Sequence, residues 1–171
     1  MTVHEIRRLG DPVLRLRCEQ VETFDAPLRA LAEDMFDTMY AAPGIGLAAN
    51  QIGRSIRLFV YDGGEGAGSG VVVNPTIVER HGGQEEDEGC LSIPGVYRPT
   101  ARAMSVRLEG MDLDGNLIAL EGEGLLARIF QHETDHLDGA LYVDRLSKAD
   151  RGSALAEFED LMARPGPRAD A

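Results

Sequence analysis

Apolar residues recur at helical spacing in the stretch that follows Asp25. They occupy positions i, i+3, i+4, i+7, i+8, i+11 and i+12, which are Leu28, Leu31, Ala32, Met35, Phe36, Met39 and Tyr40. Asp25 suits the N-cap of such a helix, and Pro27 suits its first turn. The pattern therefore predicts an amphipathic helix that ends near Pro43 and Gly44.

Shorter apolar runs predict strands. The expected strands cover 57–62, 71–74, 77–80 and 105–109, and another ends at Leu120 after a turn at 112–115. The segment 44–51 fits neither the helical nor the strand period, and we interpret it as a special loop or a short strand.

The glycine-rich segment 63–70 predicts a mobile turn. It lacks the Gly-Lys-Ser/Thr ending of a phosphate-binding loop, which argues against nucleotide binding.

Two further helices are expected in the second half of the chain. One covers about 123–137 with Gly139 as its C-cap, and the other covers about 148–163 with Leu155, Phe158 and Met162 on one face. Strands mixed with three helices predict an α+β fold, with small mixed or antiparallel sheets packed around a central helix and a helix at the C-terminus. We expect one domain over 1–164, and a frayed tail over 165–171.

The composition excludes several classes of protein. The 171 residues suit one domain, and 29 acidic against 17 basic residues give a formal charge of −12. Bulk charge therefore disfavours binding to nucleic acid or to an anionic membrane, although the first 17 residues hold four arginines. The N-terminus has no apolar signal-peptide core, and the longest uncharged stretch, 38–53, is shorter than the roughly 20 residues of a spanning helix. We expect a cytoplasmic protein.

The cysteines and histidines of the chain are few. Cys18 and Cys90 are too few for a disulfide scaffold and are expected to be thiols, with Cys18 a small core residue. Two of the four histidines fall in the segment 132–136, His-Glu-Thr-Asp-His. His132 and His136 lie one helical turn apart, so both can direct a nitrogen at one metal ion. Glu133 lies beside them, where it can take a proton from metal-bound water. The central helix is thus predicted to bind metal.

Spacing alone leaves the third metal ligand open. A metzincin would need a third histidine where this chain has Tyr142, which excludes that class. Glu157 and Glu159 lie at about the distance of a thermolysin-like third ligand, although their pattern is typical of solvent-facing acids. Cys90 is the stronger candidate, because two histidines and one cysteine form a three-ligand set that leaves a position for water.

Helical spacing also predicts the surroundings of the metal. Leu125, Ile129, His132 and His136 follow one another at i, i+4, i+7 and i+11 and share one stripe. The metal would then lie beside an apolar wall formed by Leu125 and Ile129. Such a site suits a carbonyl substrate with an unbranched or apolar side chain, although both residues can equally be plain core residues.

Three segments of the chain carry a family resemblance. They are Gly-Ile-Gly-Leu-Ala-Ala-Asn-Gln at 44–51, Glu-Gly-Cys-Leu-Ser at 88–92 and Gln-His-Glu-Thr-Asp-His at 131–136. All three motifs, their order and their separations resemble those of peptide deformylases. The similarity covers most of the chain, to about residue 147.

The resemblance implies hydrolysis of the N-formyl group from formylmethionine at the start of new polypeptides, with release of formate. Cys90, His132 and His136 would hold one divalent metal ion, usually Fe²⁺ in the family and replaceable by Zn²⁺, Ni²⁺ or Co²⁺. Glu133 would act as general base toward a metal-bound water and then as the acid for the leaving amine. The metal, the Gln51 side-chain amide and the Leu91 backbone N–H would hold the oxyanion, so that Gln51 and Leu91 would be catalytic together with Glu133.

The resemblance also assigns the residues around the metal. Backbone groups of Ile45, Gly46 and Gly89 would pair with the extended substrate, and the methionine side chain would fill the apolar wall of Leu125 and Ile129 with help from Ile45. An ion pair between Glu88 and Arg102 would support the loop of the metal-ligating cysteine.

Other features depart from the resemblance or leave roles open. The run 84–88 is unusually acidic for a segment beside the cleft. Arg128 lies one turn before His132, where it either rims the pocket or belongs to a solvated helix face. The terminal helix is acidic, so ribosome docking through it, known for basic helices of some relatives, is a weak hypothesis here. We expect a monomer whose partners are nascent chains, without DNA or a membrane.

Two alternative functions stay open at this point. The first is another His-Glu-x-x-His metallopeptidase, with Glu157 as the third ligand. The second is a non-catalytic relative that binds metal or formyl-peptides. The presence of both Glu133 and Gln51 argues against the second alternative, because a binding protein needs neither a base nor an oxyanion donor.

Overall fold

The computed structural model describes residues 2–164. Its elements, in chain order, are η1 (Pro12–Arg15), α1 (Ala26–Ala41), β1 (Gly46–Ala48), η2 (Ala49–Ile52), β2 (Leu58–Asp62), β3 (Ser69–His81), β4 (Gln84–Cys90), β5 (Ile93–Arg102), β6 (Ser105–Met111), β7 (Leu117–Glu123), α2 (Leu125–Leu137), η3 (Tyr142–Arg145) and α3 (Lys148–Ala163). The predicted tail, 165–171, lies outside the described residues.

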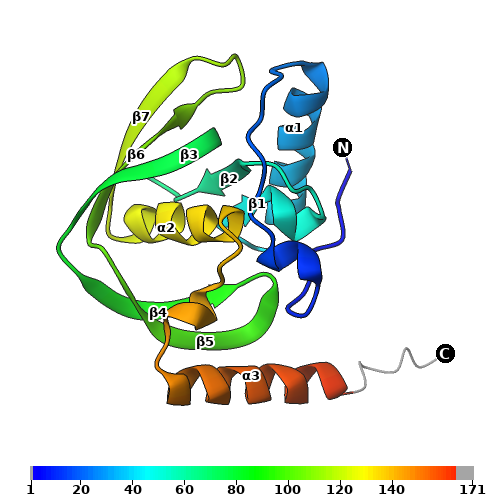
Figure 1. Cartoon of the computed structure of the whole chain (residues 1–171), viewed down its shortest axis with the longest axis vertical. Helices are drawn as coiled ribbons and strands as arrows, with labels where there is room; N and C mark the ends of the chain where they lie inside the picture. Colours follow the sequence, from blue (N-terminus) through cyan, green and yellow to red (C-terminus); the bar gives the residue numbers. More distant parts are fainter. Residues whose placement is uncertain (1, 165–171) are drawn as a thin grey trace.

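Two antiparallel sheets enclose helix α2. The larger sheet has the strand order β1-β2-β3-β6-β7, and the smaller one is the hairpin β4-β5. Helix α2 crosses the centre of the molecule between the two sheets, α1 lies at the side of β1 and β2, and α3 runs along β5 (Figure 1). This arrangement confirms the predicted α+β fold with a central helix and a C-terminal helix.

Helix α2 is fixed in place by aromatic and aliphatic packing against the larger sheet. Phe130 is fully buried and meets the ring of Tyr61 edge-on, with centroids 5.1 Å apart and planes at 90°. Phe59 lies on the same side, with its ring centroid 6.2 Å from that of Phe130. Aromatic pairs of this kind favour offset or edge-to-face geometry. The face of α2 opposite to these rings is thereby turned toward the β4-β5 hairpin.

The expected strands 71–74 and 77–80 form the single strand β3. The gap between the two expected ranges is accommodated as irregularities in the pairing of β3 with β6. Asn74 adopts a positive φ of 52°, and its side chain accepts from the Val21 N–H at 2.8 Å and donates to the Val21 carbonyl at 2.9 Å. These contacts compensate for the unfavourable backbone conformation, so the strand continues.

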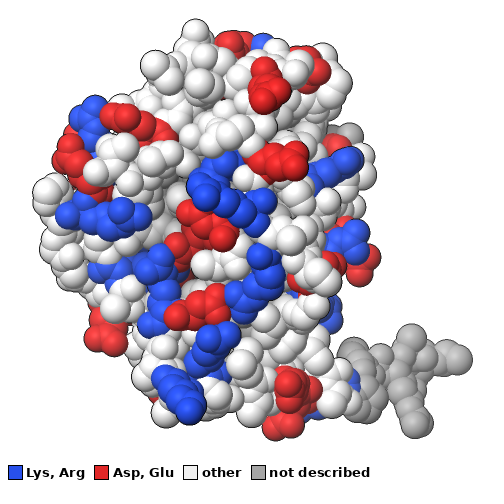
Figure 2. All heavy atoms as spheres, viewed as in Figure 1, with Lys and Arg blue, Asp and Glu red and all other residues white. Residues whose placement is uncertain are grey.

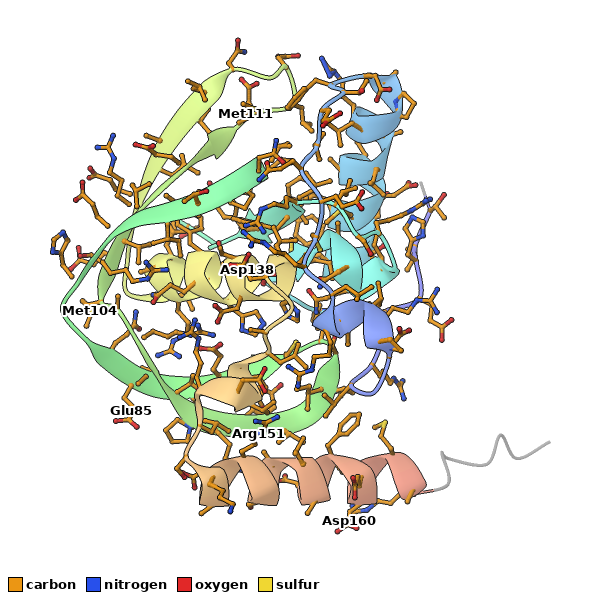
Figure 3. All side chains as sticks on the ribbon, in the orientation of Figure 1. Glu85, Met104, Met111, Asp138, Arg151 and Asp160 are labelled. Atoms are coloured by element: carbon orange, nitrogen blue, oxygen red, sulfur yellow. The ribbon has the colours of Figure 1, made fainter. Side chains whose placement is uncertain are left out.

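The hairpin β4-β5 is absent from the sequence-based expectation. Its first strand, Gln84–Cys90, contains the acidic run, which has low strand propensity. Glu85 extends from the outer side of β4 into solvent (Figure 3), whereas Glu88 is buried beneath α2. The strand is therefore stabilised by its pairing with β5 and by tertiary contacts of Glu88, which local patterns do not reveal.

Helix boundaries differ from expectation at α2 and agree at α3. Helix α2 begins at Leu125 rather than 123 because β7 continues to Glu123, and Gly124 turns the chain with a φ of 56°. Helix α3 has the predicted range, but its buried residues are Ala154 and Phe158, while Met162 is 39% exposed. Among residues 2–164, none of the helices combines the length and apolar character that a membrane-crossing segment needs.

Asp144 joins three elements near the N-terminal end of α3. Its carboxylate accepts from the backbone N–H of Leu141 at 2.9 Å and pairs with Arg15 and with Arg151, the latter at 3.1 Å. Figure 3 shows Arg151 directed from α3 toward the body of the protein. Burial opposes ionisation of Asp144, but the bond from Arg15 and the Leu141 N–H outweigh it and lower the pKa of this carboxyl group.

We expect Asp144→Asn to lower the free energy of unfolding by about 1 kcal/mol at pH 7. Because the folded-state pKa of Asp144 is depressed, its stabilisation is present above the unfolded pKa of about 3.9 and is lost as the pH falls through the folded value. Urea unfolding at pH 7 and at pH values below 4 measures this difference. Asp160→Asn, at a carboxylate that points away from the body (Figure 3), is the control. A deficit of equal size at every pH would contradict the electrostatic explanation.

Candidate metal centre and active site

Helix α2 and the end of β4 bring three ligand atoms together. The Nε2 atoms of His132 and His136 are 3.2 Å apart, and the Sγ atom of Cys90 is 3.2 Å from His136 Nε2. All three atoms lie within 4.8 Å of one another, and among residues 2–164 these side chains form the one such cluster of potential metal ligands. Cys90, the predicted third ligand, ends β4 at the turn into β5. The fold brings it next to two histidines that lie 42 and 46 positions later in the chain.

The three side chains fit a divalent metal ion. Metal–nitrogen bonds of about 2.0–2.1 Å and a metal–sulfur bond of about 2.3 Å place tetrahedral ligand atoms roughly 3.3–3.6 Å apart, close to the separations found here. A histidine ligand must be neutral; burial lowers the pKa of His136 well below its usual value, whereas the bonds to Cys90 and Glu88 outweigh burial and raise the pKa of His132 in the absence of an ion. A thiolate and two imidazoles suit Fe²⁺, Zn²⁺ and similar ions.

Glu88 fixes the orientation of His132. Its Oε1 atom lies 2.6 Å from His132 Nδ1, so this nitrogen is assigned as the donor and Nε2 is left as the acceptor that faces the other ligands. Arg102 grips the same carboxylate with two donors, Nε at 3.0 Å and Nη2 at 2.5 Å. Burial disfavours the charge on Glu88, but these bonds outweigh it and hold the pKa of Glu88 well below its usual range.

Glu133 presents a buried carboxylate beside the ligand cluster. The residue is 3% exposed, and within the described part of the chain its Oε2 atom has no hydrogen-bond partner. Burial raises the pKa of Glu133 to about 7, which suits a group that both takes and returns a proton near neutral pH. The backbone of Gly46 passes so close that a Cβ atom there would overlap Glu133 Oε1, which explains the glycine at this position.

The side chain of Gln51 is held in one orientation. Its Oε1 atom accepts from the backbone N–H of Ala48 at 2.9 Å, and its Nε2 atom donates to Ser92 Oγ at 3.1 Å. The same nitrogen lies 3.6 Å from Cys90 Sγ. The amide N–H groups are therefore directed toward the ligand cluster, while the oxygen is occupied on the opposite side.

A cavity of 430 Å³ opens onto this cluster. The predicted site residues in its wall are Ile45, Gly46, Gln51, Glu88, Gly89, Cys90, Leu91, Leu125, Ile129, His132 and Glu133. Ile129 is buried, whereas Leu125 and Ile45 are each about half exposed. The apolar wall expected from helical spacing is thus present, and it lies next to the carboxylate and the ligand atoms.

Comparisons with known proteins agree with this geometry. The sequence model described as "Polypeptide deformylase" matches residues 3–152. Peptide deformylase 1 of Corynebacterium efficiens is 50% identical over 159 residues, which cover 91% of this chain and 94% of the relative. The chain belongs to the polypeptide deformylase family.

Solved structures of the family have the same fold. The crystal structure of a peptide deformylase from Legionella pneumophila is 47% identical, has a TM-score of 0.88, and covers 96% of this chain and 100% of its own. Peptide deformylase from Ehrlichia chaffeensis in complex with actinonin is 35% identical with a TM-score of 0.88, over 96% of this chain and 100% of its own. The family removes N-formyl groups from nascent peptides, and this chain is a metal-dependent enzyme of that kind.

The structure decides between alternatives that the sequence left open at two positions of the site. Glu157 lies on α3 and pairs with Arg98 at 2.7 Å, away from both histidines, so the thermolysin-like alternative is wrong. Arg128 is 6% exposed and does not belong to a solvated helix face. It lies in the cavity wall and reaches Glu88. The position of Arg128, four residues before His132, is the one sequence signal that it faces the site. That signal is weak, because long charged side chains on helices are usually exposed.

Proposed function

We propose that this chain hydrolyses the formyl group of N-formylmethionyl polypeptides at the cluster of Cys90, His132 and His136, with Glu133 as the group that moves the protons. The observation that carries this proposal is the buried Glu133 carboxylate, whose unpartnered oxygen lies beside three converging ligand atoms in one cavity. A bound divalent metal would supply a water of lowered pKa and would polarise the formyl carbonyl.

Glu133 carries the proton in both halves of the reaction. As a carboxylate it takes a proton from the attacking water while the new C–O bond forms at the formyl carbon. As a carboxylic acid it then gives that proton to the amine nitrogen as the C–N bond breaks, and formate is the second product. The same oxygen serves both transfers, and a pKa of about 7 allows both forms to be used.

Gln51 and Leu91 are the proposed donors for the negative charge on the formyl oxygen. The Gln51 amide is already oriented by Ala48 and Ser92, so it needs no rearrangement when charge develops. Leu91 follows the cysteine ligand directly and lies in the cavity wall, and we propose that its backbone N–H is the second donor. Such fixed donors stabilise the transition state more than the substrate.

Gln51→Ala is expected to reduce kcat by about 10²- to 10³-fold, because one fixed oxyanion donor is lost. Metal content should stay at the wild-type level, since Gln51 is not among the three ligands. Formate release at saturating substrate measures kcat, and metal analysis of the same sample measures occupancy. Gln20→Ala, at an exposed amide, is the matched control. Equal kcat in Gln51→Ala and wild type would remove Gln51 from the oxyanion site.

The cavity also supports a binding mode for the peptide. Strand β1 is an edge strand of the larger sheet, and an extended peptide can add to such an edge through its main chain. We propose that Ile45, Gly46 and Gly89 supply these main-chain contacts, and that Leu125 and Ile129 receive the methionine side chain. All five residues lie in the cavity wall.

We further propose Fe²⁺ as the physiological ion, a monomeric state and action in the cytoplasm on nascent chains, within one domain over 1–164. The ligand set supports a divalent ion without selecting Fe²⁺ over Zn²⁺, Ni²⁺ or Co²⁺.

A transient ribosome contact stays a prediction. Figure 2 shows Lys and Arg side chains beside Asp and Glu side chains on the visible face, rather than one continuous basic area. Ribosome pelleting at low and high salt tests that contact.

The test of the proposed function is formate release from a formyl-Met tripeptide. The protein is purified without oxygen, freed of metal, and reloaded in parallel with Fe²⁺, Ni²⁺, Zn²⁺ or Co²⁺. We expect turnover in the reloaded samples, none in the metal-free sample, and inhibition by actinonin, the compound seen with the Ehrlichia chaffeensis relative. One bound metal per chain without any formate release would favour the non-catalytic binding alternative.

A further inference from the structure

Arg128 makes contacts that the proposed mechanism does not use. It is 6% exposed and lies on α2 four residues before His132, so both side chains project from the same face of the helix. Its Nη1 atom donates to Glu88 Oε2 at 2.6 Å and to the Thr100 carbonyl at 3.0 Å. The arginine thus links the helix that carries two metal ligands to both strands of the β4-β5 hairpin.

The two oxygens of Glu88 have different partners. Oε1 is shared by Arg102 Nη2 at 2.5 Å and His132 Nδ1 at 2.6 Å. Oε2 is shared by Arg102 Nε at 3.0 Å and Arg128 Nη1 at 2.6 Å. The last torsion of a glutamate is broad, so the plane of the carboxylate is set by its hydrogen bonds and not by its own rotamer. Arg128 provides the shorter of the two bonds to Oε2 and therefore restrains rotation of that plane.

Arg102 is not committed to Glu88 alone. Its Nη1 atom also bonds to Asp135 Oδ2 at 2.6 Å, so its charge is divided between the buried carboxylate of Glu88 and the partly buried one of Asp135. Arg128, in contrast, has Glu88 as its one acidic partner within residues 2–164. Without Arg128, Glu88 would have Arg102 as its one guanidinium partner within residues 2–164, and Arg102 would still divide its charge between Glu88 and Asp135, which also pairs with Arg145.

We propose that Arg128 is a positioning residue for the metal centre. It restrains the carboxylate plane of Glu88, and Glu88 in turn fixes the orientation of the His132 imidazole. The restrained imidazole slows dissociation of the metal ion. This inference rests on the proposed metal site. Arg128 does not contact the metal ion directly and acts on it through two side chains, Glu88 and His132. An outer-shell partner of a histidine ligand typically changes metal affinity by about 10- to 100-fold.

The test compares Arg128→Met with wild type in the full chain loaded with Co²⁺. Methionine keeps much of the aliphatic stem and removes the charge and the donors. We expect Co²⁺ release into excess chelator to be about tenfold faster or more. We also expect the low-field proton signal of His132 Nδ1–H in the Zn²⁺-loaded protein to shift or broaden. Arg107→Met, which removes an exposed ion pair with Glu109, is the matched control and should release Co²⁺ at the wild-type rate.

A purely structural role for Arg128 gives a different result. It would lower the unfolding midpoints of metal-free and metal-loaded protein equally and would leave the release rate and the His132 proton signal unchanged, and that result overturns the proposal. If Arg128→Met does not fold, Arg128→Lys serves in its place. It keeps the charge but lacks the planar fork, so its release rate should lie above the wild-type rate, and an unchanged rate overturns the proposal. A wild-type chain that binds no Co²⁺ would instead refute the metal site itself.

Discussion

Glu133→Gln should reduce formate release by about 10²- to 10⁴-fold while one metal ion stays bound per chain. Glutamine has nearly the same shape as glutamate, so it fits the space against Gly46 that the native side chain occupies. Its amide cannot take a proton from water or return one to the amine. The proposed ligands His132, His136 and Cys90 are untouched by the change, and the loss should therefore appear in kcat and not in metal content.

The measurement is initial-rate formate release from a formyl-Met tripeptide, with metal analysis of the same preparation. Glu123→Gln is the matched control, because Glu123 is an exposed glutamate at the end of β7, just before α2. Substrate binding by the Glu133→Gln protein, measured by calorimetry, should be near that of wild type. Formate release at the wild-type rate would exclude Glu133 as the proton carrier and would direct attention to another base in the cavity.

The two proposed histidine ligands could be predicted from sequence because their geometry is local. His132 and His136 lie four residues apart on one helix, and helical periodicity alone directs them to one point. Cys90 was found by chemistry and by family resemblance, because no periodic pattern relates it to residues 132 and 136. The structure places its sulfur 3.2 Å from His136 Nε2, which depends entirely on the hairpin that the sequence pattern did not predict.

Buried charges were the least predictable part of the site. An arginine at position 128 and an acidic run at 84–88 are both typical of a solvated surface. Glu88, the one fully buried acid of that run, lies 40 residues from Arg128, and each charge is stabilised inside the protein by the other, together with Arg102. The same applies to Gly46, whose lack of a side chain is explained only by the carboxylate of Glu133 that lies against it. Long-range pairing of this kind leaves no periodic signal in a single sequence.

Cys90→Ala should remove the metal and with it all turnover. The three ligand atoms form a closed cluster, so loss of the thiolate leaves two imidazoles and no negative charge in direct contact with the ion. We expect affinity to fall by more than the roughly 10- to 100-fold caused by loss of an outer-shell partner. Added metal should then raise the thermal unfolding midpoint of wild type but not of Cys90→Ala, because a ligand stabilises only the state that binds it.

The measurement is metal content after dialysis, together with thermal unfolding with and without added Zn²⁺. Cys18→Ala is the matched control: Cys18 is a buried thiol in the core, and burial raises its pKa to about 11, so it stays protonated and is a poor ligand. Its loss should lower stability modestly and leave metal content unchanged. Retention of one metal at wild-type affinity by Cys90→Ala would mean that another side chain completes the site. The proposed assignment of Cys90 would then be wrong, while the proposed roles of the two histidines and Glu133 would be unaffected by that result.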